Sequence, residues 1–152
     1  MATILVVDDD ADHCEVLGRI LERAGHHTFC ADNGWEALVT LDRSNIDLIV
    51  LDLMMPGMDG PTFLSILRND RRHHDIPVIV LTALHDTALA ARARRLGVNA
   101  VIPKTRISFT DILEDVEQAL ANSAAASANA QLHVNPGSDP GASNRPSAGA
   151  GN

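Results

Sequence analysis

The sequence predicts an α/β fold in which five parallel strands alternate with five helices. Three runs of consecutive aliphatic residues are typical of parallel strands buried on both faces, and they occupy residues 4–7, 48–51 and 78–81. Two weaker strands are expected at residues 28–30 and 100–102. Apolar residues recur at helical spacing between these runs. This alternation requires right-handed crossovers, which place helices on both faces of a single sheet.

Residues that commonly cap helices mark the expected helix boundaries. Gly25 and Gly97 stand where a C-cap glycine would end two of the helices. Residues 108–111, Ser-Phe-Thr-Asp, match a capping box that opens the final helix. Asp10 follows the first strand and is interpreted as a helix cap. The segments with helical periodicity are residues 14–24, 37–41, 63–67, 87–96 and 112–120.

Length and composition fit one domain. The chain has 152 residues, of which 45% are hydrophobic, enough for one sizeable core. A formal net charge of −8 argues against a free-standing nucleic-acid binder, because that role usually needs a basic stripe to meet phosphates. The arginines at 71–72 and at 92, 94 and 95 are interpreted as parts of solvated helix faces.

The cysteines and the hydropathy of the chain indicate the cellular compartment in which the protein is expected. Cys14 and Cys30 lie in neither a C-x-x-C motif nor a metal-ligand spacing, which suggests isolated thiols in a reducing compartment. No basic-then-apolar leader opens the sequence, and no apolar stretch approaches the roughly 20 residues that a membrane span requires. We therefore expect a soluble, cytoplasmic protein without membrane insertion.

Composition changes sharply near Asn122. From there to Asn152 the only charged residues are Asp139 and Arg145, and Ala, Ser, Asn, Gly and Pro dominate. Such a segment cannot bury enough apolar surface to offset its ordering entropy. We expect a domain at residues 1–121 and a flexible tail at residues 122–152, whose Ala-rich start can prolong the preceding helix.

Polar side chains stand at or just past the ends of four of the five expected strands. Three carboxylates at 8–10 follow the first strand, Asp52 the third, Thr82 the fourth and Lys104 the fifth. Taken singly, each has an ordinary interpretation as a cap, a packed hydroxyl or a surface lysine. Because ligands bind beyond the carboxyl ends of parallel strands, we expect the four groups to meet at one edge. Clustered carboxylates favour a hard cation such as Mg²⁺, and one of them can act as a nucleophile toward phosphorus.

Four segments of the chain resemble the receiver domain of bacterial response regulators, over residues 2–120. Residues 47–60, DLIVLDLMMPGMDG, are close to the most specific signature of that family. The other three segments are ILVVDD at residues 4–9, PVIVLTA at residues 77–83 and IPK at residues 102–104. The resemblance implies a flavodoxin-like (βα)5 three-layer sandwich with the strand order 2-1-3-4-5.

The resemblance also implies roles for the acidic residues. Asp52 would be phosphorylated, taking the phosphoryl group from a phosphohistidine. Asp9 would ligate Mg²⁺ directly with Asp8 beside it, and Asp52 and the backbone carbonyl of Met54 would complete the protein ligands. Mg²⁺ is the only cofactor that the resemblance implies.

Two further residues would act on the phosphoryl group. Thr82 would hydrogen-bond one phosphoryl oxygen, and Lys104 would pair with another. The expected partners are a histidine kinase or a histidine phosphotransfer protein and a downstream protein target, with no direct nucleic-acid contact and a monomer or weak dimer. The protein would catalyse only its own phosphorylation and slow dephosphorylation, and would not be an enzyme acting on an external substrate.

The sequence departs from the family pattern near the fifth strand. Val101 occupies a position that usually carries Tyr or Phe, so no swinging aromatic can report phosphorylation there. Thr105 follows Lys104 where a proline is usual, and Pro103 precedes the lysine instead. Both changes bear on how the switch couples to output.

Apolar residues occupy two positions that influence how long the phosphate survives. Met54 and Leu84 come two residues after Asp52 and Thr82. In the family these side chains flank the path of the attacking water. Apolar groups orient water poorly, so slow self-dephosphorylation is expected.

Two other functions are compatible with parts of the pattern. One is an interaction module with the receiver fold that signals without phosphate, which Val101 and the altered Lys104 loop favour. The other is a phosphatase with an aspartate nucleophile, but Met54 stands where that class carries its acid/base aspartate.

The histidine pairs at 26–27 and 73–74 are interpreted as surface turns, and Trp35 as partly exposed packing.

Overall fold

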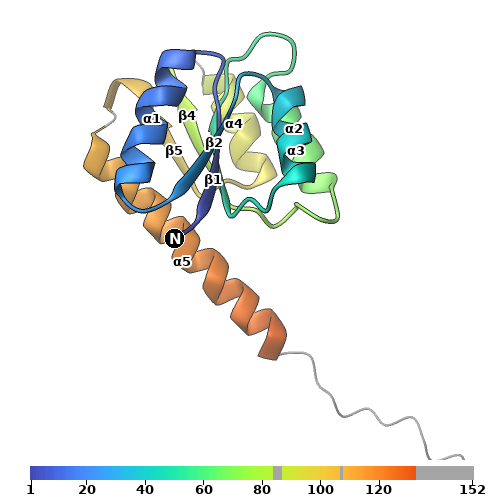
Figure 1. The fold of residues 1–152 in the computed structure, drawn as a ribbon. Helices are drawn as coiled ribbons and strands as arrows, with labels where there is room; N and C mark the ends of the chain where they lie inside the picture. Colours follow the sequence, from blue (N-terminus) through green and yellow to red (C-terminus); the bar gives the residue numbers. More distant parts are fainter. Residues whose placement is uncertain (84–86, 107, 133–152) are drawn as a thin grey trace, which may run out of the picture.

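The computed structural model describes residues 1–83, 87–106 and 108–132. Their centre is one parallel sheet with the strand order β2-β1-β3-β4-β5 (Figure 1). The strands are β1 (Thr3–Val7), β2 (His27–Ala31), β3 (Leu48–Asp52), β4 (Val78–Thr82) and β5 (Ala100–Pro103). This arrangement confirms the predicted fold class and strand order.

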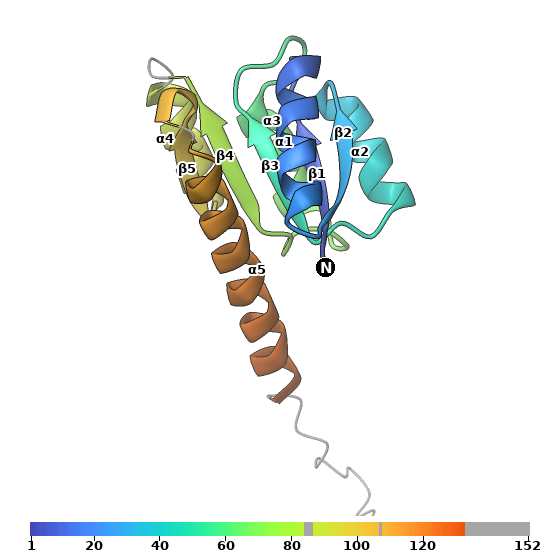
Figure 2. The same ribbon diagram turned by 60° about the vertical axis from the view of Figure 1, so that its left-hand side comes forward.

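Helices cover both faces of the sheet, as Figures 1 and 2 show. One face packs against α1 and α5, and the other against α2, α3 and α4. The helices are α1 (Ala11–Arg23), α2 (Gly34–Arg43), α3 (Gly60–Asn69), α4 (Thr87–Leu96) and α5 (Phe109–Leu132). A short 3-10 helix, η1 (Lys104–Arg106), joins β5 to the segment before α5.

Two apolar layers hold the helices to the sheet. Side chains alternate along β1, so that Ile4 and Val6 enter the layer under α1 and α5, while Leu5 and Val7 enter the opposite layer. All residues of β3 and β4 are buried, which explains their unbroken aliphatic sequence. Strand β2 lies at the edge and is only partly buried.

Helix ends carry the predicted caps. The Asp10 side chain accepts from the backbone N–H groups of Asp12 and His13 at the start of α1. Gly25 and Gly97 have φ angles of 93° and 89°, the left-handed conformation that only glycine adopts without strain. At α5, the backbone N–H of Asp111 donates to Ser108 Oγ over 3.4 Å. The predicted helix signals therefore correspond to real boundaries.

One predicted surface residue is in fact buried. The His26 side chain is only 6% exposed, and its Nε2 lies 2.8 Å from Glu117 Oε1 on α5. Its other ring nitrogen accepts from the backbone N–H of Ala2 over 3.2 Å. The interpretation of His26 as a surface turn is wrong, because the ring finds polar partners on both sides and joins the start of β1 to α5.

Helix α5 is longer than the sequence periodicity suggested. It continues to Leu132 and projects beyond the sheet, as Figure 2 shows. The alanine-rich start of the expected tail therefore prolongs the last helix, since alanine-rich residues favour helical structure even without apolar periodicity. Residues 133–152, the rest of the expected tail, lie outside the described part of the chain. Within that described part, no helix is long and apolar enough to cross a membrane.

Candidate functional site

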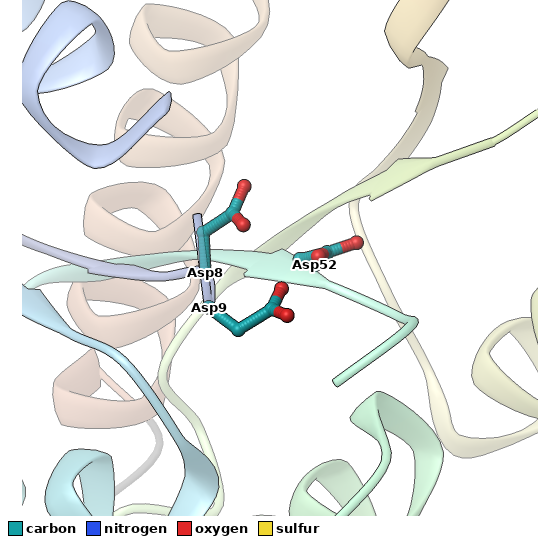
Figure 3. Close-up of side chains that lie close together, drawn as sticks. All are labelled: Asp8, Asp9 and Asp52. Atoms are coloured by element: carbon teal, nitrogen blue, oxygen red, sulfur yellow. The ribbon is translucent and has the colours of Figure 1, made fainter. Parts of the chain in front are cut away.

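Three aspartates meet at the carboxyl edge of the sheet. Asp8 and Asp9 follow β1, and Asp52 ends β3, the neighbouring strand. Each can offer one carboxylate oxygen such that all three oxygens lie within 4.8 Å of one another. Figure 3 shows the three side chains close together at the two strand ends. The structure thus brings together the acidic residues that the sequence placed in one site.

Backbone hydrogen bonds fix the loop that carries Asp8. The Asp8 side chain is 1% exposed, and its Oδ1 accepts from the backbone N–H of Asp10 over 3.0 Å. The backbone N–H of Asp8 donates to the carbonyl of Ala31, at the end of β2, over 3.0 Å. Asp9, in contrast, is exposed. The pair therefore combines one buried, oriented carboxylate with one that faces the solvent.

Asp52 is held at the base of the site. It is 3% exposed, and its Oδ1 accepts from the backbone N–H of Met54 over 3.3 Å. The following loop folds back so closely that a Cβ on Gly60 would stand 2.7 Å from Leu53 Cα. Only glycine fits there, so the DG pair of the family-like signature shapes the loop after Asp52.

Lys104 bridges two of the carboxylates. Its Nζ lies 3.2 Å from Asp52 Oδ2 and 3.4 Å from Asp8 Oδ2. Lys104 begins η1, directly after β5, and its side chain is 21% exposed. The sequence contains no other lysine. Its ammonium group compensates part of the negative charge that the aspartates concentrate at this edge.

These contacts perturb the ionisation of the site. Burial, followed by the nearby charge of Asp8, raises the pKa of Asp52 to about 6, although Lys104 and the Met54 N–H act in the opposite direction. Burial alone would lower the pKa of Lys104, but the charges of Asp52 and Asp8 outweigh it and raise that pKa. The site therefore carries an electrostatic cost that a cation can relieve.

Thr82 ends β4 at the same edge, but it does not bind the carboxylates in this conformation. It is 8% exposed, and its hydroxyl donates to the carbonyl of Ala83 over 3.1 Å. The hydroxyl would have to leave this bond to reach a group on Asp52. Leu84, the apolar residue expected near the path of attacking water, lies outside the described residues.

His13 is a neighbour of the site that the sequence analysis missed. Its Nδ1 lies 3.4 Å from Asp8 Oδ2 and 3.8 Å from Asp10 Oδ2. The side chain is half exposed. The only signal in the sequence was its position three residues after Asp10 in the first turn of a predicted helix.

The side chains of the loop after Asp52 divide between solvent and core. Met54 is 53% exposed, whereas Met55 and Met58 are buried in the layer under α2 and α3. Val101, at the position that usually carries an aromatic residue, is partly buried against the same layer. Trp35 is 66% exposed, more than its expected role in packing implied.

The donor set fits a hard divalent cation. Asp8, Asp9 and Asp52 supply carboxylate oxygens from two strand ends, and the backbone N–H of Met54 donates to Asp52 Oδ1. Oxygen ligands from a few carboxylates are what Mg²⁺ prefers. Among the residues that the structure describes, these three form the one group of this kind with ligand atoms so close together.

Known proteins share the fold and the family features of this chain. Residues 4–117 match the family model of the response regulator receiver domain. The DNA-binding response regulator MtrA of Mycobacterium tuberculosis is 38% identical over 101 residues, which cover 66% of this chain and 43% of MtrA. The CpxR homolog of Haemophilus influenzae, a transcriptional regulatory protein, is 33% identical over 85% of this chain and 55% of that protein.

A solved structure extends the similarity to three dimensions. It is the signal receiver domain of a signal transduction histidine kinase from Syntrophus aciditrophicus, with a TM-score of 0.74 and 33% identity. The match covers 80% of this chain and 92% of that domain. By contrast, the chain spans less than half the length of MtrA, so the similarity to that regulator covers only part of it.

Proposed function

Because this chain belongs to the response regulator receiver domain family of two-component systems, we propose that it is a phosphorylation-controlled switch whose phosphate acceptor is Asp52. One observation carries this proposal. The Asp52 carboxylate is buried at a strand end, with Lys104 Nζ 3.2 Å from its Oδ2 and two further aspartates beside it. The Lys104 ammonium is close enough to Asp52 to balance the negative charge of an incoming phosphoryl group.

The transfer uses Asp52 as the nucleophile. A carboxylate oxygen attacks the phosphorus of a phosphohistidine on the partner protein, so that an O–P bond forms and the P–N bond breaks. The electron pair of the broken bond stays on the imidazole nitrogen of the partner. Lys104 and the backbone N–H of Met54 hold the Asp52 carboxylate in place. Lys104 can also pair with a phosphoryl oxygen.

A magnesium ion would be held by the carboxylates of Asp8, Asp9 and Asp52 and by the backbone carbonyl of Met54. When bound, it neutralises charge on the phosphoryl oxygens and helps to align the donor phosphate. The Asp10 N–H already orients the Asp8 carboxylate, and the exposed Asp9 carboxylate is open to an ion that arrives from solvent.

The switch requires a change at Thr82. Its hydroxyl proton is directed to the Ala83 carbonyl, so it must turn to donate to a phosphoryl oxygen. Lys104 must divide its contacts between Asp8, Asp52 and the new charge. Movement at the ends of β4 and β5 then changes the adjoining surface. Val101 stands on β5 where the family usually has an aromatic residue, so this change proceeds without the movement of an aromatic ring.

The partners follow from this chemistry. The phosphoryl donor is a histidine kinase or a histidine phosphotransfer protein, and the output is a contact with another protein. The net charge of −8 disfavours direct contact of this chain with nucleic acid, whatever the remaining parts of its DNA-binding relatives do. The chain turns over no external substrate; it shifts between two states.

Titration with beryllofluoride, a phosphoryl mimic, tests the proposal. In calorimetry the wild type should bind it only when Mg²⁺ is present, and Asp52→Asn should not bind it at all. Asp59→Asn is a matched control, because Asp59 caps α3 without belonging to the acidic cluster. If the folded wild type does not bind beryllofluoride with Mg²⁺ present, by calorimetry and by a shift in its melting temperature, the chain is instead an interaction module that signals without phosphate.

A further inference from the structure

The two cysteines of the chain lie against each other across α1 and β2. Cys30 Sγ is 3.5 Å from the carbonyl oxygen of Cys14. Cys14 Sγ lies 3.7 Å from the carbonyl oxygen of Val6, and Val6 is the residue paired with Cys30 in the sheet. Both thiols therefore gather around one point of the β1–β2 ladder, although 16 positions separate them in the sequence.

Side-chain alternation places both thiols on the same face of the sheet. Phe29 packs into the layer under α2 to α4, so Cys30, the next residue along β2, points toward α1. Cys14 belongs to the layer under α1 and α5, together with Val6. One helical turn after Cys14, a Cβ on Gly18 would stand 3.4 Å from Thr28 Oγ1. At this point α1 packs directly against β2, in the same region as the two cysteines.

The two thiols differ in their access to solvent. Cys14 is 5% exposed, whereas Cys30 is exposed. Both residues line an open cavity of about 340 Å³, together with Asp8, Ala11 and Asp32 among others. A small oxidant can therefore reach Cys30, whereas Cys14 is shielded from solvent.

We propose that Cys14 and Cys30 are a modification site, at which a peroxide or a small-molecule disulfide forms a reversible intramolecular disulfide bond. The exposed Cys30 is the thiol that reacts first. Burial, followed by contact with the Cys30 thiol, raises the pKa of Cys14, so Cys14 resists direct oxidation. Once Cys30 is oxidised, the neighbouring Cys14 is positioned to attack it.

The reaction with a peroxide balances in two steps. The Cys30 thiolate attacks hydrogen peroxide; an S–O bond forms, the O–O bond breaks, and hydroxide leaves. The Cys14 sulfur then attacks the sulfenic sulfur of Cys30, an S–S bond forms, and water leaves with the Cys14 proton. Two thiols and one peroxide give one disulfide and two waters. A small dithiol reductant reverses the change by thiol–disulfide exchange.

The disulfide would join the two segments that support the acidic cluster. The Cys14 N–H donates to the carbonyl of Asp10 over 3.1 Å, and the Asp8 N–H donates to the carbonyl of Ala31, next to Cys30. The bond would therefore form directly behind the loop that presents Asp8 and Asp9.

Intact mass spectrometry of the full chain tests this site. The protein is treated with hydrogen peroxide, or separately with oxidised glutathione, and then alkylated with N-ethylmaleimide. The wild type should lose about 2 Da, take up no N-ethylmaleimide and recover both thiols after dithiothreitol. A non-reducing digest should contain the peptides around Cys14 and Cys30 joined within one chain.

Single substitutions give matched controls. Cys30→Ser should leave Cys14 reduced and slow to alkylate in the folded protein. Cys14→Ala should stop at an oxygen or glutathione adduct on Cys30, and its circular dichroism checks that the core tolerates the change. The site is refuted if wild-type Cys30 accumulates an adduct while Cys14 stays reduced, if the disulfide joins two chains, or if both thiols survive the oxidant.

Discussion

Lys104 Nζ lies 3.2 Å from Asp52 Oδ2, and this contact ties the end of β5 to the end of β3 across β4. The same ammonium lies 3.4 Å from Asp8 Oδ2. It thus stands between two buried carboxylates that would otherwise face each other. The charge balance of the site, as much as the identity of the nucleophile, determines what the site can bind.

Replacing Lys104 by Met should destabilise the protein at neutral pH. The substitution removes the cation but keeps most of the apolar stem, which leaves two buried carboxylates without compensation. We expect a loss of about 1–3 kcal/mol in the free energy of unfolding. Urea unfolding at pH 7.5 measures it, and the loss should shrink in an Asp52→Asn background, where one carboxylate is absent. Equal losses in both backgrounds would show that Lys104 and Asp52 are not coupled.

Stability should depend on pH through Asp52. With a pKa of about 6, folded Asp52 keeps its proton to a higher pH than it does in the unfolded chain. The folded state therefore binds more protons between about pH 4 and 6, and its stability falls as the pH rises through that range. Asp52→Asn removes this dependence and should stabilise the protein at pH 7.5 by on the order of 1–3 kcal/mol.

Urea unfolding of both proteins at pH 5 and at pH 7.5, without Mg²⁺, measures this difference. The gap between variant and wild type should be smaller at pH 5. A gap that widens toward pH 5 would mean that Asp52 is stabilised as a carboxylate in the folded state.

Asp9 should contribute to Mg²⁺ binding but not to the stability of the metal-free fold. Because Asp9 is exposed, Asp9→Asn should leave the metal-free melting temperature almost unchanged. At a Mg²⁺ concentration ten times its Kd, binding stabilises the wild type by about 1.4 kcal/mol, and Asp9→Asn should lose most of this gain. Thermal melts with and without Mg²⁺ measure it. Asp12→Asn, a nearby carboxylate outside the cluster, should respond to Mg²⁺ like the wild type.

Polar residues two positions after Asp52 and Thr82 should shorten the life of the phosphorylated state. Met54 is 53% exposed and offers attacking water no hydrogen bond. Met54→Gln and Leu84→Gln together should speed loss of phosphate by roughly tenfold, equivalent to about 1.4 kcal/mol of barrier. The decay of the phosphorylated mass over time measures this rate. Val39→Gln, an exposed apolar residue on α2, is the control, and an unchanged lifetime in the double variant would refute the idea.

Much of the fold could be predicted because each strand has its own local signal. The runs at residues 4–7, 48–51 and 78–81 are aliphatic throughout, since both of their faces are buried. The positions of Asp8, Asp9 and Asp52 then followed from the rule that parallel strands present their carboxyl ends at one edge. No long-range information was needed for either step.

Other features depend on contacts that local patterns do not encode. The burial of His26 requires Glu117 to arrive from α5, 91 positions away in the sequence. The meeting of Cys14 with Cys30 depends on how closely α1 packs on β2. Such relationships need the assembled sheet.

The central claim, that Asp52 accepts phosphate, is tested most directly by intact mass spectrometry of protein mixed with Mg²⁺ and a small phosphodonor such as acetyl phosphate. The wild type should gain one phosphate, and Asp52→Asn should gain none while remaining folded by circular dichroism. A phosphate that also appears on Asp52→Asn, or a wild type that stays at its original mass while Mg²⁺ is bound, would contradict the claim.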